Sequence, residues 1–443
     1  MQLSESQVLA LAPDSGSAHN GKKLAQAKHW PLLGQSERAL WGECQGSGSK
    51  PYQVRVDLAD FASKCSCPSF KFPCKHALGL LVLTANQPAL VQTGDEPEWV
   101  TSWLDKRSET AQKKEARAEA KAAAPVDEAA QRKRADKRDH RMQDGLAALD
   151  IWLQDVVRNG LARLPAEGTS LWEQQAARLV DAQLGGLAAR VRALADVPGS
   201  SPDWPAAVLA ELGRWSLAIR AYGQIDTLPA PLQSTLRQYL GSTVREDEVL
   251  AHGDVQADCW HVIGQTRNDD DRVRVLRTWL MGQRSQRPAL LLQFAVGAQN
   301  FEAAPVPGTA FDAELAYWPG AAPLRALVKS KATPAPGPQG FAGPLLSVPE
   351  LLERWAQTLA LNPWHDSLPV LLQGVTPVSQ PSADGPRWLA ADAQGLALPL
   401  AGNAPWRWLA LTGGQPQALA ALWDGQALRP LGLFGPGAVF HPL

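Results

Sequence analysis

The segment Lys64-Cys-Ser-Cys-Pro-Ser-Phe-Lys-Phe-Pro-Cys-Lys-His76 is the most informative stretch of this chain. It places Cys65, Cys67, Cys74 and His76 in the pattern Cys-x-Cys-x6-Cys-x-His. Three thiolates and one imidazole complete the tetrahedral coordination that Zn²⁺ prefers and leave no position for a water molecule. The spacing therefore predicts a structural zinc site rather than a catalytic one.

A disulfide, a group of buried thiols and a chance arrangement are the alternatives to a zinc site. The amino terminus lacks the basic start and apolar core of a secretory signal, so we expect a cytoplasmic protein, where disulfides are rare. Lys64, Lys71 and Lys75 lie beside the cysteines, which argues against thiols buried as small hydrophobic groups. The same lysines can stabilise the net negative charge of a zinc ion bound by three thiolates.

The residues around the cysteines predict a β-β-α module. Two runs in which apolar and polar residues alternate are separated by a turn-rich connector, and this pattern predicts a β-hairpin. An apolar run after His76 predicts a helix. A helical leader in two pieces precedes the hairpin. These predicted elements are the leader at 3–27, the strands at 39–44 and 52–58 with the connector 45–51, and the helix from Ala77 that ends before Pro88.

A hairpin followed by Cys-x-Cys and then by Cys-x-His at the start of a helix resembles the SWIM-type zinc finger. Leu40-Trp-Gly-Glu-Cys-Gln-Gly-Ser-Gly48, together with the cysteine segment, looks like the bacterial SWIM zinc finger proteins in particular, over roughly residues 35 to 90. The resemblance gives the four ligand positions to Cys65, Cys67, Cys74 and His76. It also implies a role in DNA binding or in protein interaction.

The chain has no phosphate-binding loop, because Asn20-Gly-Lys-Lys23 lacks the first glycine and the hydroxyl of that motif. Bacterial SWIM proteins of this kind look like members of gene neighbourhoods with MoxR-type AAA+ ATPases and von Willebrand A-type proteins. The resemblance therefore implies that a partner supplies any nucleotide hydrolysis.

The whole chain is predicted to be an α+β multidomain protein. Its composition, 45% hydrophobic and 20% charged residues, is that of a globular protein, and no window has the roughly 18 apolar residues of a membrane span. Six regions follow from the patterns: 1–104, the zinc finger module with its leader; 105–145, a charged helical linker; 146–250, a helical domain; 251–332, an antiparallel β region; 333–346, a Pro/Gly linker; and 347–443, a helix with a β-rich C-terminal domain.

Other candidate sites are weaker than the cysteine cluster. Cys259 and His261, with His252 and Asp254, could form a second metal site, but a strand would also place the first two on one face for packing. The acidic run 269–271 could bind a cation, although a polar hairpin turn explains it as well. Cys44 is expected to be a core thiol. No acid-base pair or activated nucleophile stands out, so we predict a protein that is not an enzyme.

Charge is unevenly distributed along the chain. Residues 1–104 are neutral, 105–141 carry +4 and 142–443 carry −5, which gives the total of −1. As a nucleic-acid binder, the protein would place Lys64, Lys71 and Lys75 on phosphates and Phe70 or Phe72 against a base, with 105–141 as a basic tether. The neutral finger module favours a protein-binding adaptor over this alternative.

Zinc is expected to hold the finger together, because a hairpin and one helix bury only a small core. Loss of Cys74 or His76 should therefore unfold the finger. The charged linker and Pro125 are expected to uncouple the domains beyond Arg141, which should persist.

Overall fold

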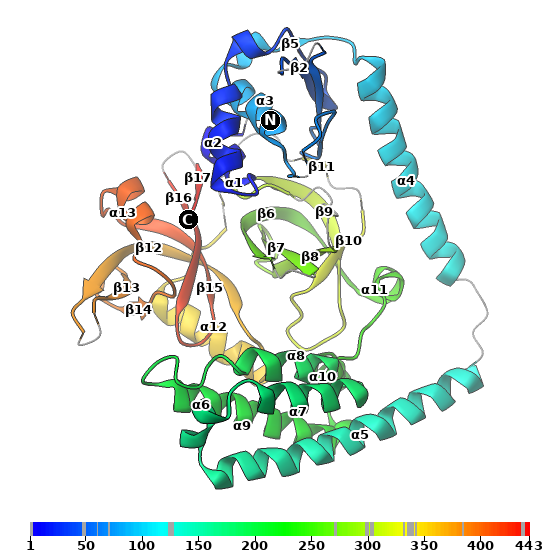
Figure 1. The fold of residues 1–443 in the computed structure, drawn as a ribbon, viewed down its shortest axis with the longest axis vertical. Coiled ribbons are helices and arrows are strands. Elements are labelled where there is room, and N and C mark those ends of the chain that lie inside the picture. Colours follow the sequence, from blue (N-terminus) through cyan, green and yellow to red (C-terminus); the bar gives the residue numbers. More distant parts are fainter. Residues whose placement is uncertain are drawn as a thin grey trace.

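The computed structural model describes residues 3–46, 50–59, 61–69, 71–122, 128–269, 273–296, 301, 305–330, 333–334, 341, 343–382, 385–435 and 439–443. Within these residues the chain forms an N-terminal sheet with helices, a helical region and two antiparallel sheets, which confirms the predicted α+β class. Figure 1 shows the N-terminal module at the top, the two sheets in the middle and the helical region below them.

The N-terminal module combines two short helices, a five-stranded sheet and a third helix. The sheet has the order β4-β3-β2-β1-β5, and its central hairpin pairs Ala39 with Asp57 and Cys44 with Tyr52, as predicted. The three short outer strands were not predicted, because they have two to four residues and show no alternation. The elements are α1 (Glu5–Ala10), α2 (Ser15–Leu24), β1 (Leu32–Gln35), β2 (Ala39–Cys44), β3 (Tyr52–Asp57), β4 (Ser63–Cys65), α3 (Lys75–Asn86) and β5 (Gln92–Thr93).

Helix α3 is the centre of this module. Its residues from His76 to Leu83 are all buried, so the helix packs against the sheet on one side and against α2 on the other. The α2–α3 crossing is close because two glycines meet there: a Cβ added at Gly21 would lie 2.7 Å from Leu78 Cβ, and one at Gly79 would lie 2.9 Å from Leu24 Cβ.

Two long helices connect the N-terminal module to the helical region. The first turns of α4 (Glu98–Ala122) cover the face of the sheet that carries Trp41, where the Arg55 guanidinium lies over the Trp99 and Trp103 rings. Helix α5 (Glu128–Asn159) then runs along the helical region (Figure 1). Pro125, which is expected to help uncouple the two parts, lies outside the described residues.

The helical region packs around the core side of α5. It contains α6 (Leu164–Glu167), α7 (Ser170–Asp181), α8 (Gly185–Leu194), α9 (Trp204–Tyr222) and α10 (Ala230–Leu240). Trp172, Ala176 and Leu179 form a buried apolar stripe on α7, whereas Val180, one residue or about 100° of helix rotation beyond Leu179, is exposed.

Two six-stranded antiparallel sheets make up the C-terminal half, with α11 (Glu246–His252) ahead of the first. The first sheet has the order β10-β9-β6-β7-β8, with β11 also paired to β9, and the second has the order β14-β13-β12-β15-β16-β17. The strands of the first are β6 (Asp254–Asp269), β7 (Val273–Gly282), β8 (Pro288–Val296), β9 (Ala310–Tyr317), β10 (Ala326–Val328) and β11 (Thr333–Pro334). The second sheet, which follows α12 (Val348–Leu361), contains β12 (Leu368–Gln380), β13 (Arg387–Ala391), β14 (Ala397–Pro399), β15 (Gln417–Trp423), β16 (Leu428–Phe434) and β17 (Phe440–Pro442), with α13 (Trp406–Thr412) between β14 and β15.

Some sequence predictions for this half fall at the limits of the described residues. The expected Pro/Gly linker begins with β11, and its residues 335–340 and 342 lie outside the described part. Asp269 is the last residue of β6, and residues 270 and 271 of the acidic run also lie outside it. None of the helices among the described residues is long and apolar enough to cross a membrane.

The N-terminal module rests on the C-terminal half instead of being joined to it only through α4 and α5. The Gln7 side chain of α1 is buried and donates a hydrogen bond to the Pro307 carbonyl over 3.1 Å, and Val306 belongs to the core of the module. A Cβ added at Gly308 would meet both Gln7 and Phe440 of β17. The finger module therefore contacts the C-terminal half directly, and the expectation that the linker uncouples their unfolding stays a prediction.

Candidate metal centre

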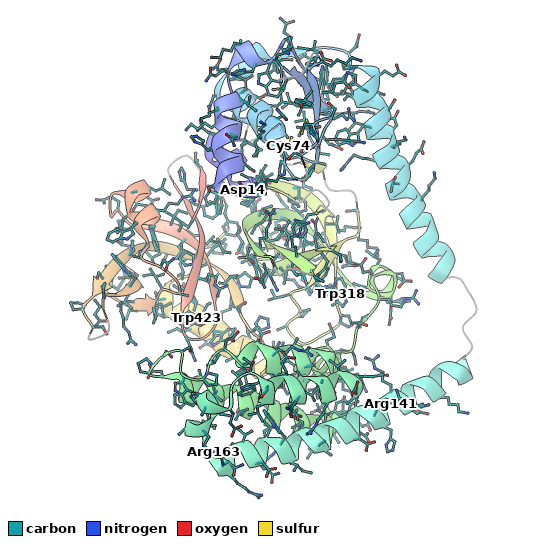
Figure 2. All side chains as sticks on the ribbon, viewed as in Figure 1. Asp14, Cys74, Arg141, Arg163, Trp318 and Trp423 are labelled. Atoms are coloured by element: carbon teal, nitrogen blue, oxygen red, sulfur yellow. The ribbon has the colours of Figure 1, made fainter. Side chains whose placement is uncertain are left out.

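The four predicted ligands come together at the start of α3. Cys65 ends strand β4, Cys67 lies in the loop that follows, and Cys74 and His76 belong to the N-cap and first turn of α3. One ligand atom from each of the four lies within 4.8 Å of the others. Figure 2 marks the position of Cys74 within the N-terminal module.

The distances within this cluster fit a tetrahedral metal ion. The Nδ1 atom of His76 lies 3.8 Å from Cys65 Sγ and 4.0 Å from Cys74 Sγ. A zinc ion with bonds of about 2.3 Å to sulfur and about 2.0 Å to nitrogen places neighbouring ligand atoms roughly 3.6 Å apart. The imidazole thus faces the thiols with Nδ1, and this is the nitrogen that would bind the metal.

Backbone amides favour negative charge on the sulfur atoms. The amide of Ala77 donates to Cys74 Sγ and the amide of Cys67 to Cys65 Sγ, both over 3.4 Å. A hydrogen bond from the Cys65 thiol lowers the pKa of Cys74 to about 4, and His76 and the Ala77 amide contribute in the same direction. The Cys65 thiol donates that hydrogen bond, and this raises its own pKa. Metal binding needs deprotonated thiols, so the site already favours the first thiolate.

Two residues next to the cluster support it without supplying a ligand. The Tyr52 ring lies 4.8 Å from the His76 ring, centroid to centroid, and packs against the imidazole. Cys44 is fully buried in the core of the module, and burial raises the pKa of its thiol to about 11. Cys44 therefore stays protonated as a core thiol, in agreement with the sequence.

The residues predicted to contact a ligand lie near the metal centre and differ in burial and in whether they already form an ion pair. Lys71 forms a 2.9 Å ion pair with Asp14, whose carboxylate also accepts from the Ser17 amide at the start of α2. Lys64 and Lys75 are exposed and Phe72 is half-buried. Phe70 lies outside the described residues. The role of these side chains in binding stays a prediction.

The weaker second metal site does not form. His261 is buried and its Nε2 lies 3.2 Å from Gln283 Oε1, and Asp254 pairs with Arg287 over 2.7 Å. Among the described residues, Cys65, Cys67, Cys74 and His76 are the one group of three or more ligating side chains close enough to hold an ion. Packing on a strand accounts for Cys259 and His261.

Comparison with protein families places two modules in the chain. Residues 52–83 match the SWIM zinc finger, and residues 137–240 match the SWIM-associated four-helix bundle domain. Comparisons with curated proteins and with solved structures give no match. The sequence predicted a helical domain at 146–250, but without a motif it did not connect that domain with the finger. The chain thus contains a metal-binding SWIM zinc finger and, from within α5 to the end of α10, the four-helix bundle domain associated with such fingers.

Proposed function

We propose that the finger holds one Zn²⁺ ion in a structural role and that the chain is a non-enzymatic adaptor. The observation that carries this proposal is the closed ligand set of three cysteines and one histidine, which completes a tetrahedron and leaves no position for substrate or water. Zinc at this point links strand β4 and its loop to the start of α3. The ion thereby fixes the surface that the finger presents.

The surroundings of the finger support a protein as its partner. The N-terminal 104 residues are electrically neutral, and Lys71 is paired with Asp14. A nucleic-acid interface needs an excess of cations on one face, because phosphate neutralisation supplies most of its affinity. The partner classes that the resemblance suggests are a MoxR-type AAA+ ATPase and a von Willebrand A-type protein, with the ATPase supplying the nucleotide hydrolysis that this chain has no motif for.

Nucleic acid is the second candidate ligand, favoured by a specific observation. Lys64 and Lys75 flank the metal centre and are exposed, and the +4 segment at 105–141 lies mainly in α4 and α5, which leave the finger as long helices. Together these groups could follow a phosphate backbone. The Lys71–Asp14 pair is exposed to solvent and contributes little to stability, so Lys71 could also exchange its partner for a phosphate.

A salt titration separates the two candidates. The zinc-loaded full chain is mixed with a labelled DNA duplex of random sequence, and its affinity is measured as salt is raised. The adaptor proposal predicts little binding at about 150 mM salt, and no change in that result for Lys64→Ala/Lys75→Ala. Tight binding that falls linearly with log salt, and a shallower slope in the double variant, would favour nucleic acid.

A pull-down with purified partners tests the adaptor itself. The full chain should retain a MoxR-type ATPase or a von Willebrand A-type protein from the same host, and Cys74→Ala should lose that retention because the finger surface is no longer fixed. Cys259→Ala, which changes a cysteine far from the metal centre, is the matched control and should behave as wild type. Equal retention by all three proteins would argue against the finger as the docking surface.

A further inference from the structure

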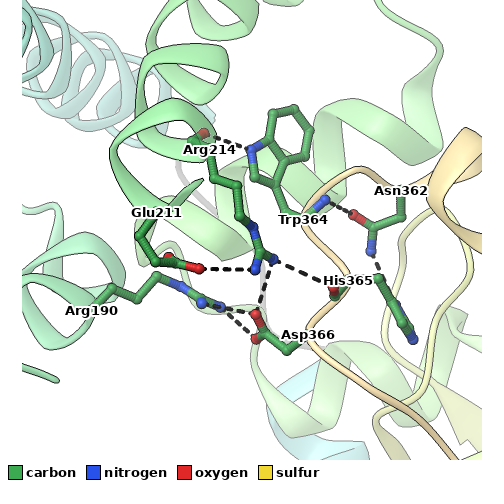
Figure 3. Close-up of polar contacts among 7 residues, drawn as sticks. All are labelled: Arg190, Glu211, Arg214, Asn362, Trp364, His365 and Asp366. Atoms are coloured by element: carbon green, nitrogen blue, oxygen red, sulfur yellow. Dashed lines mark hydrogen bonds and ion pairs between the residues drawn. The ribbon is translucent and has the colours of Figure 1, made fainter. Parts of the chain in front are cut away.

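A short segment between α12 and β12 attaches the C-terminal sheet to the helical bundle. Figure 3 shows this segment, Asn362–Asp366, against Arg190 of α8 and Arg214 of α9. It forms no helix or strand of its own. Its Trp364 is only 4% exposed and belongs to the core of the bundle, although the bundle helices all precede it in the chain. A side chain from a separate domain therefore completes the bundle core.

The bundle holds Trp364 by shape and by one hydrogen bond. The indole Nε1 donates to the Arg214 carbonyl over 3.2 Å, and the ring lies 5.7 Å from that of Tyr239 in α10. The Arg190 guanidinium in turn covers the Tyr239 ring at 4.4 Å. A buried aromatic anchor with its polar atom satisfied is the kind of group that dominates recognition energies.

The bundle holds Asp366 by two arginines. Arg190 donates to both carboxylate oxygens, over 2.9 and 2.7 Å, and Arg214 donates to Asp366 over 3.1 Å and to the His365 carbonyl over 3.4 Å. Glu211 orients Arg214 from the next turn of α9. Burial alone would raise the pKa of Asp366, but the arginines outweigh it and hold that pKa below its usual value. A bidentate arginine selects a carboxylate by geometry as well as by charge.

The segment has its own internal structure. The Asn362 side chain accepts from the Trp364 amide over 3.0 Å, and the Asn362 carbonyl accepts from the His365 amide. These local bonds shape the segment without help from the bundle. A preorganised segment loses less conformational freedom when it binds, which is what a short recognition peptide requires.

We propose that the surface formed by α8, α9 and α10 is a recognition site for segments of the form Trp-x-Asp or Trp-x-Glu. In this chain Trp364 and Asp366 occupy it, and a partner protein that carries such a segment competes with them. Tethering gives the chain's own segment an effective concentration of about the millimolar range, so a free peptide binds well only after that segment is removed. The site is separate from the metal centre, so this proposal can fail while the function proposed for the finger stands.

Binding of a synthetic peptide to the full chain tests the proposal. The probe is a fluorescein-labelled peptide of residues 360–368, and the protein is Trp364→Ala/Asp366→Ala, which empties the site. We expect saturable binding in fluorescence anisotropy, at least tenfold tighter than to the wild-type chain. A probe with alanine in place of tryptophan should not bind, and adding Arg190→Ala to the protein should weaken binding by roughly tenfold.

A second variant covers the case in which the bundle needs Trp364 to fold. Asp366→Arg keeps the indole but places a cation against Arg190 and Arg214, so the tethered segment should loosen and the probe should bind at least threefold more tightly than to wild type. Glu353→Arg, on the exposed side of α12, is the matched control and should equal wild type. The proposal is overturned if the folded variants bind the probe no better than wild type, or bind the alanine probe equally well.

Discussion

Tyr52 is not a metal ligand, but its ring contacts the ligand His76. The Tyr52 ring packs on the imidazole, on the strand that pairs with β4, and so restrains the direction in which Nδ1 points. Groups that orient a metal ligand typically change metal affinity by 10- to 100-fold when they are removed. The orientation of His76 therefore depends on a residue outside the cysteine motif.

We expect Tyr52→Ala to weaken zinc binding by about tenfold, because the imidazole loses the ring that restrains it. Competition with a coloured chelator at constant pH measures the affinity. Tyr52→Phe keeps the ring and should bind zinc as the wild type does. If Tyr52→Ala and Tyr52→Phe have the same affinity, ring packing does not orient the ligand.

His261 makes the stability of the C-terminal half depend on pH. Burial lowers the pKa of this histidine, against smaller opposing effects of its bond to Gln283 and of the nearby Asp258 carboxylate. In the unfolded chain His261 binds a proton near pH 6.5, whereas in the folded chain it stays neutral at that pH. The free energy of unfolding should therefore fall as the pH drops below about 6.5. Melting temperatures of zinc-saturated wild type and His261→Gln, between pH 7.5 and pH 5, should differ in slope. Parallel curves for the two proteins would contradict this assignment.

Sequence reasoning worked well for residues with a motif or a strong pattern. The ligand quartet, the β2–β3 hairpin and α3 lie where they were predicted, because each has local spacing or a cap that specifies it. Asp14 as the partner of Lys71, and Trp364 as part of the bundle core, could not be predicted in this way. Each depends on a contact between segments distant in sequence, which a local pattern does not record.

Helices α8 and α10 pack closely because glycines meet at their contact. A Cβ added at Gly186 would lie 2.4 Å from the Tyr239 carbonyl oxygen and 2.8 Å from the Gly241 amide nitrogen, both of them backbone atoms. Neighbouring Gly185 has open space around its Cβ position. A methyl group at Gly186 would thus clash with the backbone, whereas one at Gly185 would not.

We expect Gly186→Ala to destabilise the bundle by about 1–3 kcal/mol, because the backbone of α10 must move to accept the methyl group. Gly185→Ala is the control, and it should be neutral or slightly stabilising because alanine favours a helix. Chemical denaturation followed by helical circular dichroism compares the two. Equal stability of the variants would show that the helices do not pack as closely as described.

The assembled molecule couples the finger to its neighbours at two places. Helix α4 and the first part of α5 connect it covalently to the bundle, and α1 rests on residues 306–308 and β17 of the C-terminal half (Figure 1). Large apolar contacts also join the two C-terminal sheets, with Ile263, Met281, Leu371 and Leu431 in one shared cluster. Among the described residues the finger alone contains a candidate metal centre, so we expect loss of metal to affect the finger first.

Limited proteolysis tests this dependence. Without Cys74 the metal no longer joins β4 to α3, and we expect the finger of Cys74→Ala to be cleaved within residues 3–104 while the bundle and both sheets survive as a resistant fragment. Structural zinc contributes roughly 10–16 kcal/mol in small fingers, more than such a module holds in reserve. A chain degraded throughout, or a finger as resistant as that of wild type, would refute this expectation.

Metal content measured by mass spectrometry tests the assignment of the zinc centre itself. Full-length protein purified under reducing conditions without chelator should contain one zinc ion per chain, and Cys74→Ala and His76→Ala should contain much less than one. Cys44→Ala and Cys259→Ala should each retain the full zinc content, because neither residue belongs to the ligand set. Wild-type protein without zinc, or equal zinc in all five proteins, would contradict a zinc centre formed by Cys65, Cys67, Cys74 and His76.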